Sequence, residues 1–238
     1  MSKPVIVLDP GHGGYDPGAV YHGLEEKDLN LKLALQVATS LGRSGAVKVL
    51  LTRERDIYVS LADRVALSRR AGADLFLSLH ANAGGGRGFE SFVHGTGDAL
   101  VEMQEAVHDE VVSALARWSI IDRGLKQAAF YVLRHNPAPA ILIESLFIDN
   151  RREAALWQDK RFVETLAGAV VRGVRTALEL PAEENRDAAD REASGPAEGS
   201  TLYTVQVGAF SYIENARQRL AEAQGAGFSD AYIYQKQF

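Results

Sequence analysis

The stretch that decides the fold is VIVLDPGHGG, residues 5–14, a short apolar run that ends in a glycine-rich turn carrying a histidine. An apolar run without polar alternation is typical of a strand that is buried on both faces of a parallel sheet. The glycines allow the chain to turn sharply and let a ligand approach the backbone closely. We therefore expect an inner strand whose carboxyl end presents His12.

Strand and helix patterns alternate from this stretch to about residue 180. Ser60 with Asp63, and Asn150 with Glu153, have the spacing of a capping box, in which a side chain caps the start of a helix. The alternation predicts an α/β domain, built on a single twisted, largely parallel sheet with helices on both faces. Strands are expected at 5–9, 47–53, 74–80, 89–94, 130–133 and 140–145, and helices at 25–43, 60–71, 98–117 and 150–180.

The composition changes at residues 181–200, PAEENRDAADREASGPAEGS, which contain no Val, Ile, Leu, Met or aromatic residue. Such a stretch cannot bury enough apolar surface to order itself, so it is interpreted as a flexible linker. The chain of 238 residues therefore divides into a main domain, 1–180, the linker, 181–200, and a small C-terminal module, 201–238.

Charge and composition exclude several classes of protein. The net charge of −5 argues against a nucleic-acid-binding surface, and the absence of cysteine excludes disulfides and thiolate metal sites, so that any metal must be held by His, Asp or Glu. No stretch has the length of a membrane-spanning helix, and none has the form of a signal peptide. We expect a chain that is made in the cytoplasm without insertion into a membrane.

Two of the six histidines, His12 and His80, end expected strands, and ligands of open α/β sheets bind beyond the carboxyl ends of strands. Either histidine alone would more simply be an isolated loop residue. Glu26 heads a helical stripe with Leu29, Leu33 and Val37, whereas Glu25 points to one side. Two histidines and a glutamate form a recognised catalytic zinc set. His22 is the competing ligand, while His94, His108 and His135 are expected to be surface or satisfied core residues.

Glu144 lies in the otherwise apolar strand 140–145, where a carboxylate is seldom buried without a partner. A structural ion pair with Arg134 or Arg151 would explain it. Alternatively, Glu144 is a base beside the metal, which takes a proton from an attacking water and passes it to a leaving amine. Asn82 and Lys126 could also contact a substrate, although a structural role is the simpler expectation for both.

The motifs together resemble the zinc-dependent N-acetylmuramoyl-L-alanine amidase family. The resemblance implies that His12, Glu26 and His80 bind one Zn²⁺ and that Glu144 is the catalytic acid/base. It also implies hydrolysis of the amide that joins N-acetylmuramic acid to L-alanine in peptidoglycan. The motifs occur in the family's order and are IVLDPGHGG at 6–14, EKDLNL at 26–31, LTR at 51–53, SLHAN at 78–82, PAILIE at 139–144 and FIDN at 147–150.

The C-terminal module resembles the first half of a sporulation-related (SPOR) peptidoglycan-binding repeat. It has a strand-like segment at 202–210, a helix-like segment at 215–224 and a second strand-like segment at 231–234. A single strand–helix–strand half would leave strand edges open, so we expect it to be unstable alone or to pair with a second copy in a dimer.

These resemblances predict an enzyme that degrades the cell wall, of the kind that lyses the mother cell in sporulation. A phage-type endolysin amidase is one alternative. A second is a non-catalytic peptidoglycan-binding protein on an amidase-like fold, which the intact set of His12, Glu26, His80 and Glu144 disfavours. A third is a zinc hydrolase of another amide, such as a peptide bond, which the residues alone do not exclude.

Overall fold

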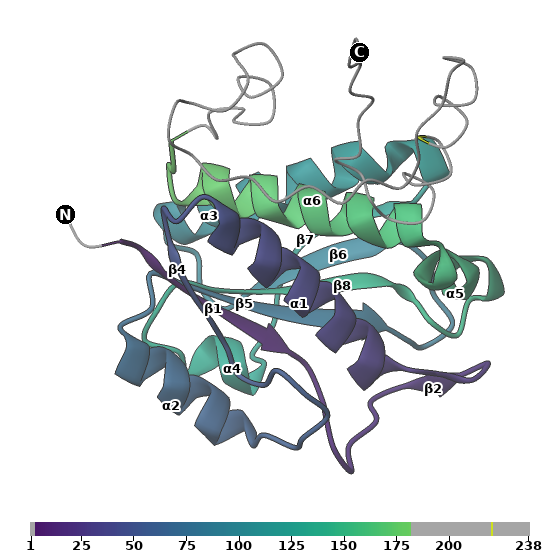
Figure 1. Ribbon diagram of the computed structural model, residues 1–238, viewed down its shortest axis with the longest axis horizontal. Helices are drawn as coiled ribbons and strands as arrows, with labels where there is room; N and C mark the ends of the chain where they lie inside the picture. The colour runs from purple at the N-terminus through teal and green to yellow at the C-terminus, as the bar shows by residue number, and fades with distance from the viewer. Residues whose placement is uncertain (1–2, 182–219, 221–238) are drawn as a thin grey trace, which may run out of the picture. The chain divides into compact units, whose positions relative to one another are not determined.

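A computed structural model describes residues 3–181 and residue 220. Of the linker and the C-terminal module predicted from the sequence, only Pro181 and Leu220 are among these residues. Residues 3–181 form a six-stranded sheet with helices on both faces, as Figure 1 shows. Strand order across the sheet is β4-β1-β5-β8-β6-β7. Its strands are β4 (Lys48–Leu51), β1 (Val5–Pro10), β5 (Leu75–Asn82), β8 (Ala140–Phe147), β6 (Phe89–Val93) and β7 (Asp122–Gln127). The predicted α/β fold is confirmed for this domain.

The sheet is largely parallel, with one antiparallel junction. Strands β4, β1, β5 and β8 run parallel to one another, β6 pairs antiparallel with β8, and β7 runs parallel to β6. The carboxyl ends of β1, β5 and β8 therefore lie at the same end of the sheet as the amino ends of β6 and β7. Residues that end the inner strands and residues that begin the outer ones are brought to the same place.

The two faces of the sheet are covered unequally (Figure 1). Helices α1 (Glu26–Arg43), α3 (Asp98–Leu115) and α6 (Lys160–Ala177) pack on one face, which we call the covered face. Their side chains form the larger core, together with strand residues such as Leu8, Leu77 and Ile143. Helices α2 (Leu61–Ala71) and α4 (Tyr131–Arg134) lie on the other face over a smaller core, which includes Val7, Phe76 and Leu142. We call this second face the open face.

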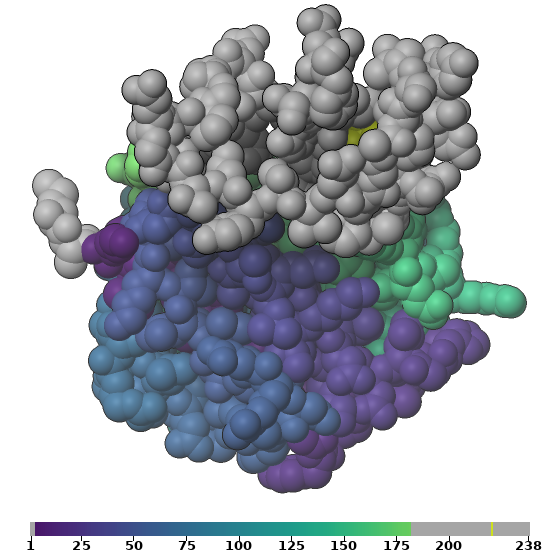
Figure 2. All heavy atoms as spheres, in the orientation of Figure 1, coloured from purple at the N-terminus to yellow at the C-terminus, as the bar shows by residue number. Residues whose placement is uncertain are grey.

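The remaining elements are short. A turn of 3₁₀ helix, η1 (Ala116–Trp118), follows α3, and α5 (Arg151–Gln158) precedes α6. Strands β2 (Val20–Tyr21) and β3 (Leu24–Glu25) form a separate hairpin that leads into α1. Figure 2 shows that segments from the first third of the chain, coloured purple to blue, make much of the described surface on the side in view. None of the helices in the described part of the chain is long and apolar enough to span a membrane.

Three sequence-based expectations are wrong in detail. Residues 130–133 were expected to form a strand, but the carbonyl of Phe130 accepts bonds from the amides of Leu133 and Arg134, which begins helix α4. Strand β7 was not predicted, because it lies at the sheet edge and its side chains are partly exposed. The helix expected over 150–180 is two helices, because Asp159 has an extended backbone and its carboxylate caps α6 by accepting from the amide of Arg161.

The N-cap of each predicted capping box is confirmed at the start of a helix, whereas the carboxylate of Glu153 accepts from the amides of Gly88 and Phe147 instead. The Ser60 hydroxyl accepts from the amide of Asp63 at the start of α2. The side chain of Asn150 accepts from the amides of Arg152 and Glu153 at the start of α5. Such caps satisfy amides that have no partner within the helix, so these boundaries could be read from side-chain chemistry alone.

Candidate metal centre and catalytic carboxylate

His12 follows β1 in a loop whose backbone is fixed by charged side chains. Its φ of 60° is uncommon for a residue other than glycine. The guanidinium of Arg64 donates to the carbonyls of Pro10 and His12 at 2.8 Å each, and that of Arg53 donates to the carbonyls of Pro10 and Gly11 at 3.0 and 2.8 Å. The loop is thus held at its carbonyl oxygens, and the imidazole of His12 is left to contact Asp16 and Glu26.

A buried carboxylate supports this clamp. Asp9 is 1% exposed and accepts from Arg64 at 2.7 Å, from the hydroxyl of Thr52 at 2.6 Å and from the hydroxyl of Ser78 at 2.8 Å. A buried charge is tolerated when it is paired and fully hydrogen-bonded, as here. Asp9 and Arg53 belong to sequence motifs that gave neither residue a role, and Arg64 belongs to none. Their roles depend on contacts between distant segments.

Glu26 is the first residue of α1 and is buried at the top of the stripe formed by Leu29, Leu33 and Val37. Its Oε1 lies 2.9 Å from Nδ1 of His80, and its Oε2 lies 3.2 Å from Nε2 of His12. The neighbouring Glu25 instead lies 3.2 Å from the ammonium of Lys27. The helix geometry therefore brings Glu26, and not Glu25, between the two histidines.

Two glycines allow this close packing. A Cβ on Gly11 would lie 2.1 Å from Cε1 of His80, and a Cβ on Gly18 would lie 2.5 Å from Oε2 of Glu26. Gly18 also has a φ of +65°, which favours glycine. Both positions exclude any larger residue, because the ring of His80 and the carboxylate of Glu26 occupy the space.

His12, Glu26 and His80 each offer a ligand atom, and these atoms all lie within 4.8 Å of one another. The rings of the two histidines are nearly perpendicular, with centroids 5.1 Å apart. Nδ1 of His12 is bound to Asp16 at 2.9 Å, which leaves its Nε2 directed at the cluster. A histidine whose second nitrogen is held by a carboxylate is the usual arrangement of a metal ligand. The three residues could hold one metal ion.

The electrostatics of the cluster favour the binding of cations between its side chains. Burial lowers the pKa of His12, but its bonds to Glu26 and Asp16 outweigh this and raise the pKa to about 9. Burial raises the pKa of Glu26, but the bonds from His12 and His80 outweigh it and hold that pKa far below its ordinary value. A proton on His12 is thus favoured in the metal-free cluster, in the space where a cation of higher charge would compete with it.

Glu144 lies on β8 in register with His80 of β5 and with Glu90 of β6. Residues paired in register point to the same face of a sheet, so all three side chains project from the open face. Burial is the largest cause that raises the pKa of Glu144, to about 7; the charge of His80 lowers it, and the charges of Glu26 and Glu90 raise it further. Its Oε2 is buried and has no hydrogen-bond partner.

The ion pair considered as an alternative explanation of Glu144 is absent from residues 3–181, since neither Arg134 nor Arg151 pairs with it there. An orphaned carboxylate oxygen beside a cluster of histidines is costly unless it has a use. A carboxyl with a pKa near 7 can both accept and donate a proton close to neutral pH.

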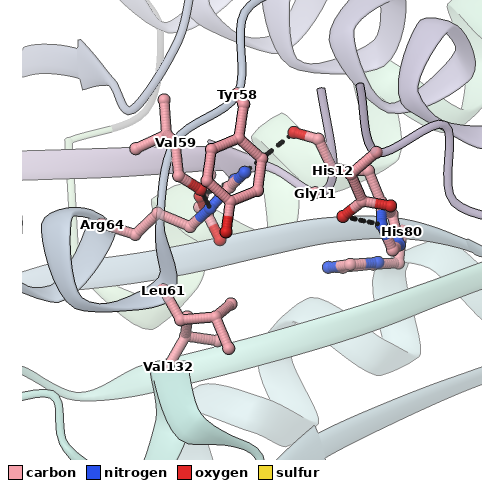
Figure 3. A pocket seen from close by; sticks show the side chains of 10 residues that line it. Gly11, His12, Tyr58, Val59, Leu61, Arg64, His80 and Val132 are labelled. Atoms are coloured by element: carbon pink, nitrogen blue, oxygen red, sulfur yellow. Dashed lines mark hydrogen bonds and ion pairs between the residues drawn. The ribbon is translucent and has the colours of Figure 1, made fainter. Parts of the chain in front are cut away.

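A cavity of about 290 Å³ opens beside the cluster, as Figure 3 shows. His12 and His80 line one side of it, and Tyr58, Leu61 and Val132 line the other. The ring of Tyr58 also stacks on the exposed Tyr15, with centroids 4.2 Å apart. The cavity therefore offers a partly apolar surface directly beside the candidate metal ligands.

The other histidines lie outside this cluster. His22, the competing ligand, is exposed in the turn of the β2–β3 hairpin against the ring of Tyr21. His94 and His135 are exposed, and His108 is buried with both ring nitrogens bonded, to Ser91 and Asp122. Each of the three is therefore a surface or satisfied core residue, as expected.

Comparison with known proteins agrees with this geometry. Residues 6–176 match the family model described as N-acetylmuramoyl-L-alanine amidase, and residues 199–237 match that of the SPOR domain. The sporulation-specific N-acetylmuramoyl-L-alanine amidase of Bacillus subtilis is 39% identical over 230 residues, which cover 96% of this chain and 84% of that protein. An endolysin of Bacillus phage SPP1 is 38% identical over 209 residues, covering 86% of this chain and 76% of the endolysin.

Solved structures show the same similarity. The catalytic domain of CwlV, an N-acetylmuramoyl-L-alanine amidase from Bacillus (Paenibacillus) polymyxa, superposes with a TM-score of 0.71 at 31% identity. The match covers 75% of this chain and 99% of that domain. An N-acetylmuramoyl-L-alanine amidase from Clostridium difficile gives a TM-score of 0.71 at 32% identity, over 76% of this chain and 99% of the other.

Proposed function

Because the chain belongs to the N-acetylmuramoyl-L-alanine amidase family, we propose that it cuts peptidoglycan at one zinc ion held by His12, Glu26 and His80, with Glu144 as the catalytic acid/base. The reaction is hydrolysis of the amide between N-acetylmuramic acid and L-alanine. The observation that carries the proposal is the position of Glu144, which lies in register with His80 and keeps one buried carboxylate oxygen without a partner.

The three ligands fit zinc by their chemistry. Two imidazoles and a carboxylate leave the fourth position of a tetrahedral site open, which is the pattern of catalytic zinc. A zinc ion bound there would polarise the scissile carbonyl and lower the pKa of a water molecule. Asp16 orients His12, and Asn30 donates to Oε1 of Glu26 at 3.2 Å, so each ligand is itself held in place.

Glu144 supplies the proton transfers. With a pKa raised to about 7, its carboxylate can take a proton from the attacking water and deliver it to the nitrogen of the leaving L-alanine. Its partial burial keeps bulk water from competing for that proton. The same residue therefore acts first as a base and then as an acid.

Digestion of purified peptidoglycan by the zinc-loaded chain tests the proposal. We expect new amino groups on L-alanine without new reducing sugar ends, and a loss of roughly 10²–10⁴-fold in rate for Glu144→Gln. Metal content measured on the same samples should stay at one zinc per chain in both proteins. Release of reducing ends, or an active Glu144→Gln, would contradict the assignment.

The same experiment separates the alternatives. A wild-type chain that binds peptidoglycan but releases no amino groups would be a non-catalytic binding protein. Cleavage of ordinary peptides at rates similar to those of muramoyl peptides would indicate a hydrolase of another amide. The first is disfavoured because the cluster of His12, Glu26 and His80 is complete and Glu144 stands beside it. The second is disfavoured by the family to which the chain belongs.

We also propose that residues 201–238 bind peptidoglycan, since this region matches the SPOR domain. Retention on isolated cell walls, compared between the full chain and residues 1–180, tests this. The flexible linker at 181–200 and dimerisation through the C-terminal module stay predictions. Limited proteolysis tests the first and sedimentation of the full chain tests the second, and a protease-resistant module in a monomer would count against dimerisation.

The biological setting that we propose is lysis of the mother-cell wall in sporulation. The sporulation-specific relative and the SPOR match support it, whereas the similar phage endolysin supports lysis of a host by a phage. Deletion of the gene in its own organism separates the two. A sporulation enzyme predicts mother cells that persist around mature spores, and an endolysin predicts a defect confined to phage release.

A further inference from the structure

A group of charged side chains adjoins Glu144 on the open face and contacts none of the three candidate metal ligands. Its centre is Glu90 of β6, which is 5% exposed and lies in register with Glu144. Paired residues of antiparallel strands have Cα atoms about 4.5–5.5 Å apart, so Glu90 is an immediate neighbour of the catalytic carboxyl. The next strand, β7, adds two cations on the side of Glu90 away from His80.

Glu90 holds both cations in fixed positions. Its Oε1 accepts from the side-chain amide Nδ2 of Asn82 at 2.7 Å, and its Oε2 accepts from Nε of Arg123 at 2.7 Å and from the ammonium of Lys126. Arg123 also lies over the ring of Phe147, 4.9 Å from its centroid. The two cations are therefore positioned before any ligand arrives, which lowers the entropic cost of binding one.

One carboxylate against two cations leaves a positive charge at the surface. The side chains of Arg123 and Lys126 are 33% and 35% exposed, whereas that of Glu90 is 7% exposed. Within residues 3–181 the guanidinium of Arg123 bonds Glu90 through Nε alone, so its two terminal nitrogens remain as donors. A planar guanidinium beside an ammonium matches the geometry of a carboxylate.

We propose that Arg123 and Lys126 form a subsite that binds a carboxylate of the stem peptide, one residue beyond the alanine whose amide is cut. The proposal rests on the proposed amidase function, because the position of the scissile amide is set by Glu144 and the metal ligands. Consecutive Cα atoms are 3.8 Å apart, and the side chains of Arg123 and Lys126 extend from β7 to Glu90 on β6, so the two cations lie within reach of a carboxylate on the next residue. The peptide then lies towards β7, and the sugar lies towards the cavity beside Tyr58.

An ion cluster that only fastens the edge strand β7 to the sheet is the competing explanation. It predicts that substitutions of Arg123 or Lys126 lower stability and change all substrates alike. A carboxylate subsite predicts instead an effect that depends on the charge of the peptide. The two explanations are separated by substrates that differ only in that charge.

The experiment uses two muramoyl tripeptides, muramoyl-L-alanyl-γ-D-glutamyl-L-lysine amide and its D-isoglutaminyl counterpart. In both, the γ-carboxyl of the second residue lies in the peptide bond to lysine, so the compounds differ only in its α group, which is a carboxylate in the first and a carboxamide in the second. We expect the full zinc-loaded chain to show a KM roughly fivefold lower for the carboxylate, with a similar kcat. Lys126→Gln and Arg123→Gln should reduce this preference to near one, and Lys126→Arg should retain much of it. Lys160→Gln, which removes an exposed lysine at the start of helix α6 on the covered face, is the matched control.

Binding of both compounds to Glu144→Gln, measured by calorimetry, tests the subsite without turnover. Tighter binding of the carboxylate compound, lost in the double variant Glu144→Gln with Lys126→Gln, supports the subsite. This holds even if the wild type cleaves neither compound, because the absence of cleavage would refute only the amidase function. Equal use and equal binding of both compounds by the wild type would overturn the subsite, and so would a preference that survives both Lys126→Gln and Arg123→Gln.

Discussion

Two clusters of histidine and carboxylate lie on opposite faces of the same sheet and differ in what they leave unsatisfied. On the open face, His12 and His80 share Glu26, and Glu144 stands beside them with a buried oxygen that has no partner. On the covered face, His108 of α3 bonds the hydroxyl of Ser91 at 2.9 Å and the carboxylate of Asp122 at 2.9 Å. This second cluster contains the residue types of a catalytic triad.

The covered cluster cannot work as a nucleophile. Ser91 is 0% exposed and His108 is 2% exposed, and Gln104 donates to the Ser91 hydroxyl at 3.1 Å. Every polar group is paired and no space remains for a substrate, so the cluster joins α3 to β6 and β7. The difference teaches that residue types alone do not identify a site: exposure and spare bonding capacity distinguish the open cluster from the closed one.

The largest expected effect is that of His80→Gln on the open cluster. Loss of one ligand should remove zinc from the purified protein and lower the rate of amide hydrolysis by about 10³-fold or more, because the metal supplies several kcal/mol of stabilisation to the transition state. Metal analysis and amino-group release on the same samples measure both. A variant that retains one zinc per chain would show that His80 is not a ligand.

Asp16→Asn tests how far the open cluster depends on the carboxylate that orients His12. A partner of this kind typically contributes 10–100-fold to metal affinity, and we expect a loss in that range, measured by competition with a chelating dye. The fold should be unaffected, since Asp16 lies in a loop and its side chain is 41% exposed. An unchanged affinity would mean that the backbone clamp alone positions His12.

Removal of the metal should make stability depend on pH. The pKa of His12, raised from 6.5 to about 9, favours the folded metal-free chain fully below pH 6.5, and this contribution is lost as the pH rises through 9. We expect the free energy of unfolding of the metal-free protein to fall by on the order of 1–2 kcal/mol over that range. This is less than the full pKa shift would give, because His12 is partly exposed and coupled to Glu26.

Urea unfolding at several pH values measures this change. The slope should be much smaller in His12→Gln and in the zinc-loaded protein, because a bound metal displaces the same protons. A slope that persists in His12→Gln would assign the pH dependence to other groups.

Much of the fold could be predicted from the sequence, because inner strands and helices carry strong local patterns. The runs at 5–8 and 140–143 are continuously apolar, and the structure has them in β1 and β8. β7 could not be predicted, because an edge strand buries little and its sequence DRGLKQ has a weak pattern. The break at Asp159 was missed because the residues on either side keep helical spacing.

The candidate site divides in the same way between local and long-range information. His80 and Glu144 are marked by their places in largely apolar strands and His12 by its place directly after one, and the structure brings them together near the carboxyl ends of those strands. The group around Glu90 gave no such signal, because Arg123 meets it only through the pairing of β7 with β6. The same is true of Asp9 and Arg64, which are 55 positions apart in the chain.

The smallest expected effect on activity is that of His108→Gln on the covered cluster. Glutamine can replace only part of the bonding of His108, so the free energy of unfolding should fall by about 1–2 kcal/mol. Zinc content and the rate of amide hydrolysis should stay within about twofold, because Ser91 and Glu90 are neighbours on β6 whose side chains point to opposite faces of the sheet. Urea unfolding and kcat/KM on one preparation separate the two quantities. A tenfold loss of activity in a stably folded His108→Gln would show instead that strain passes through β6 from the covered face to Glu144.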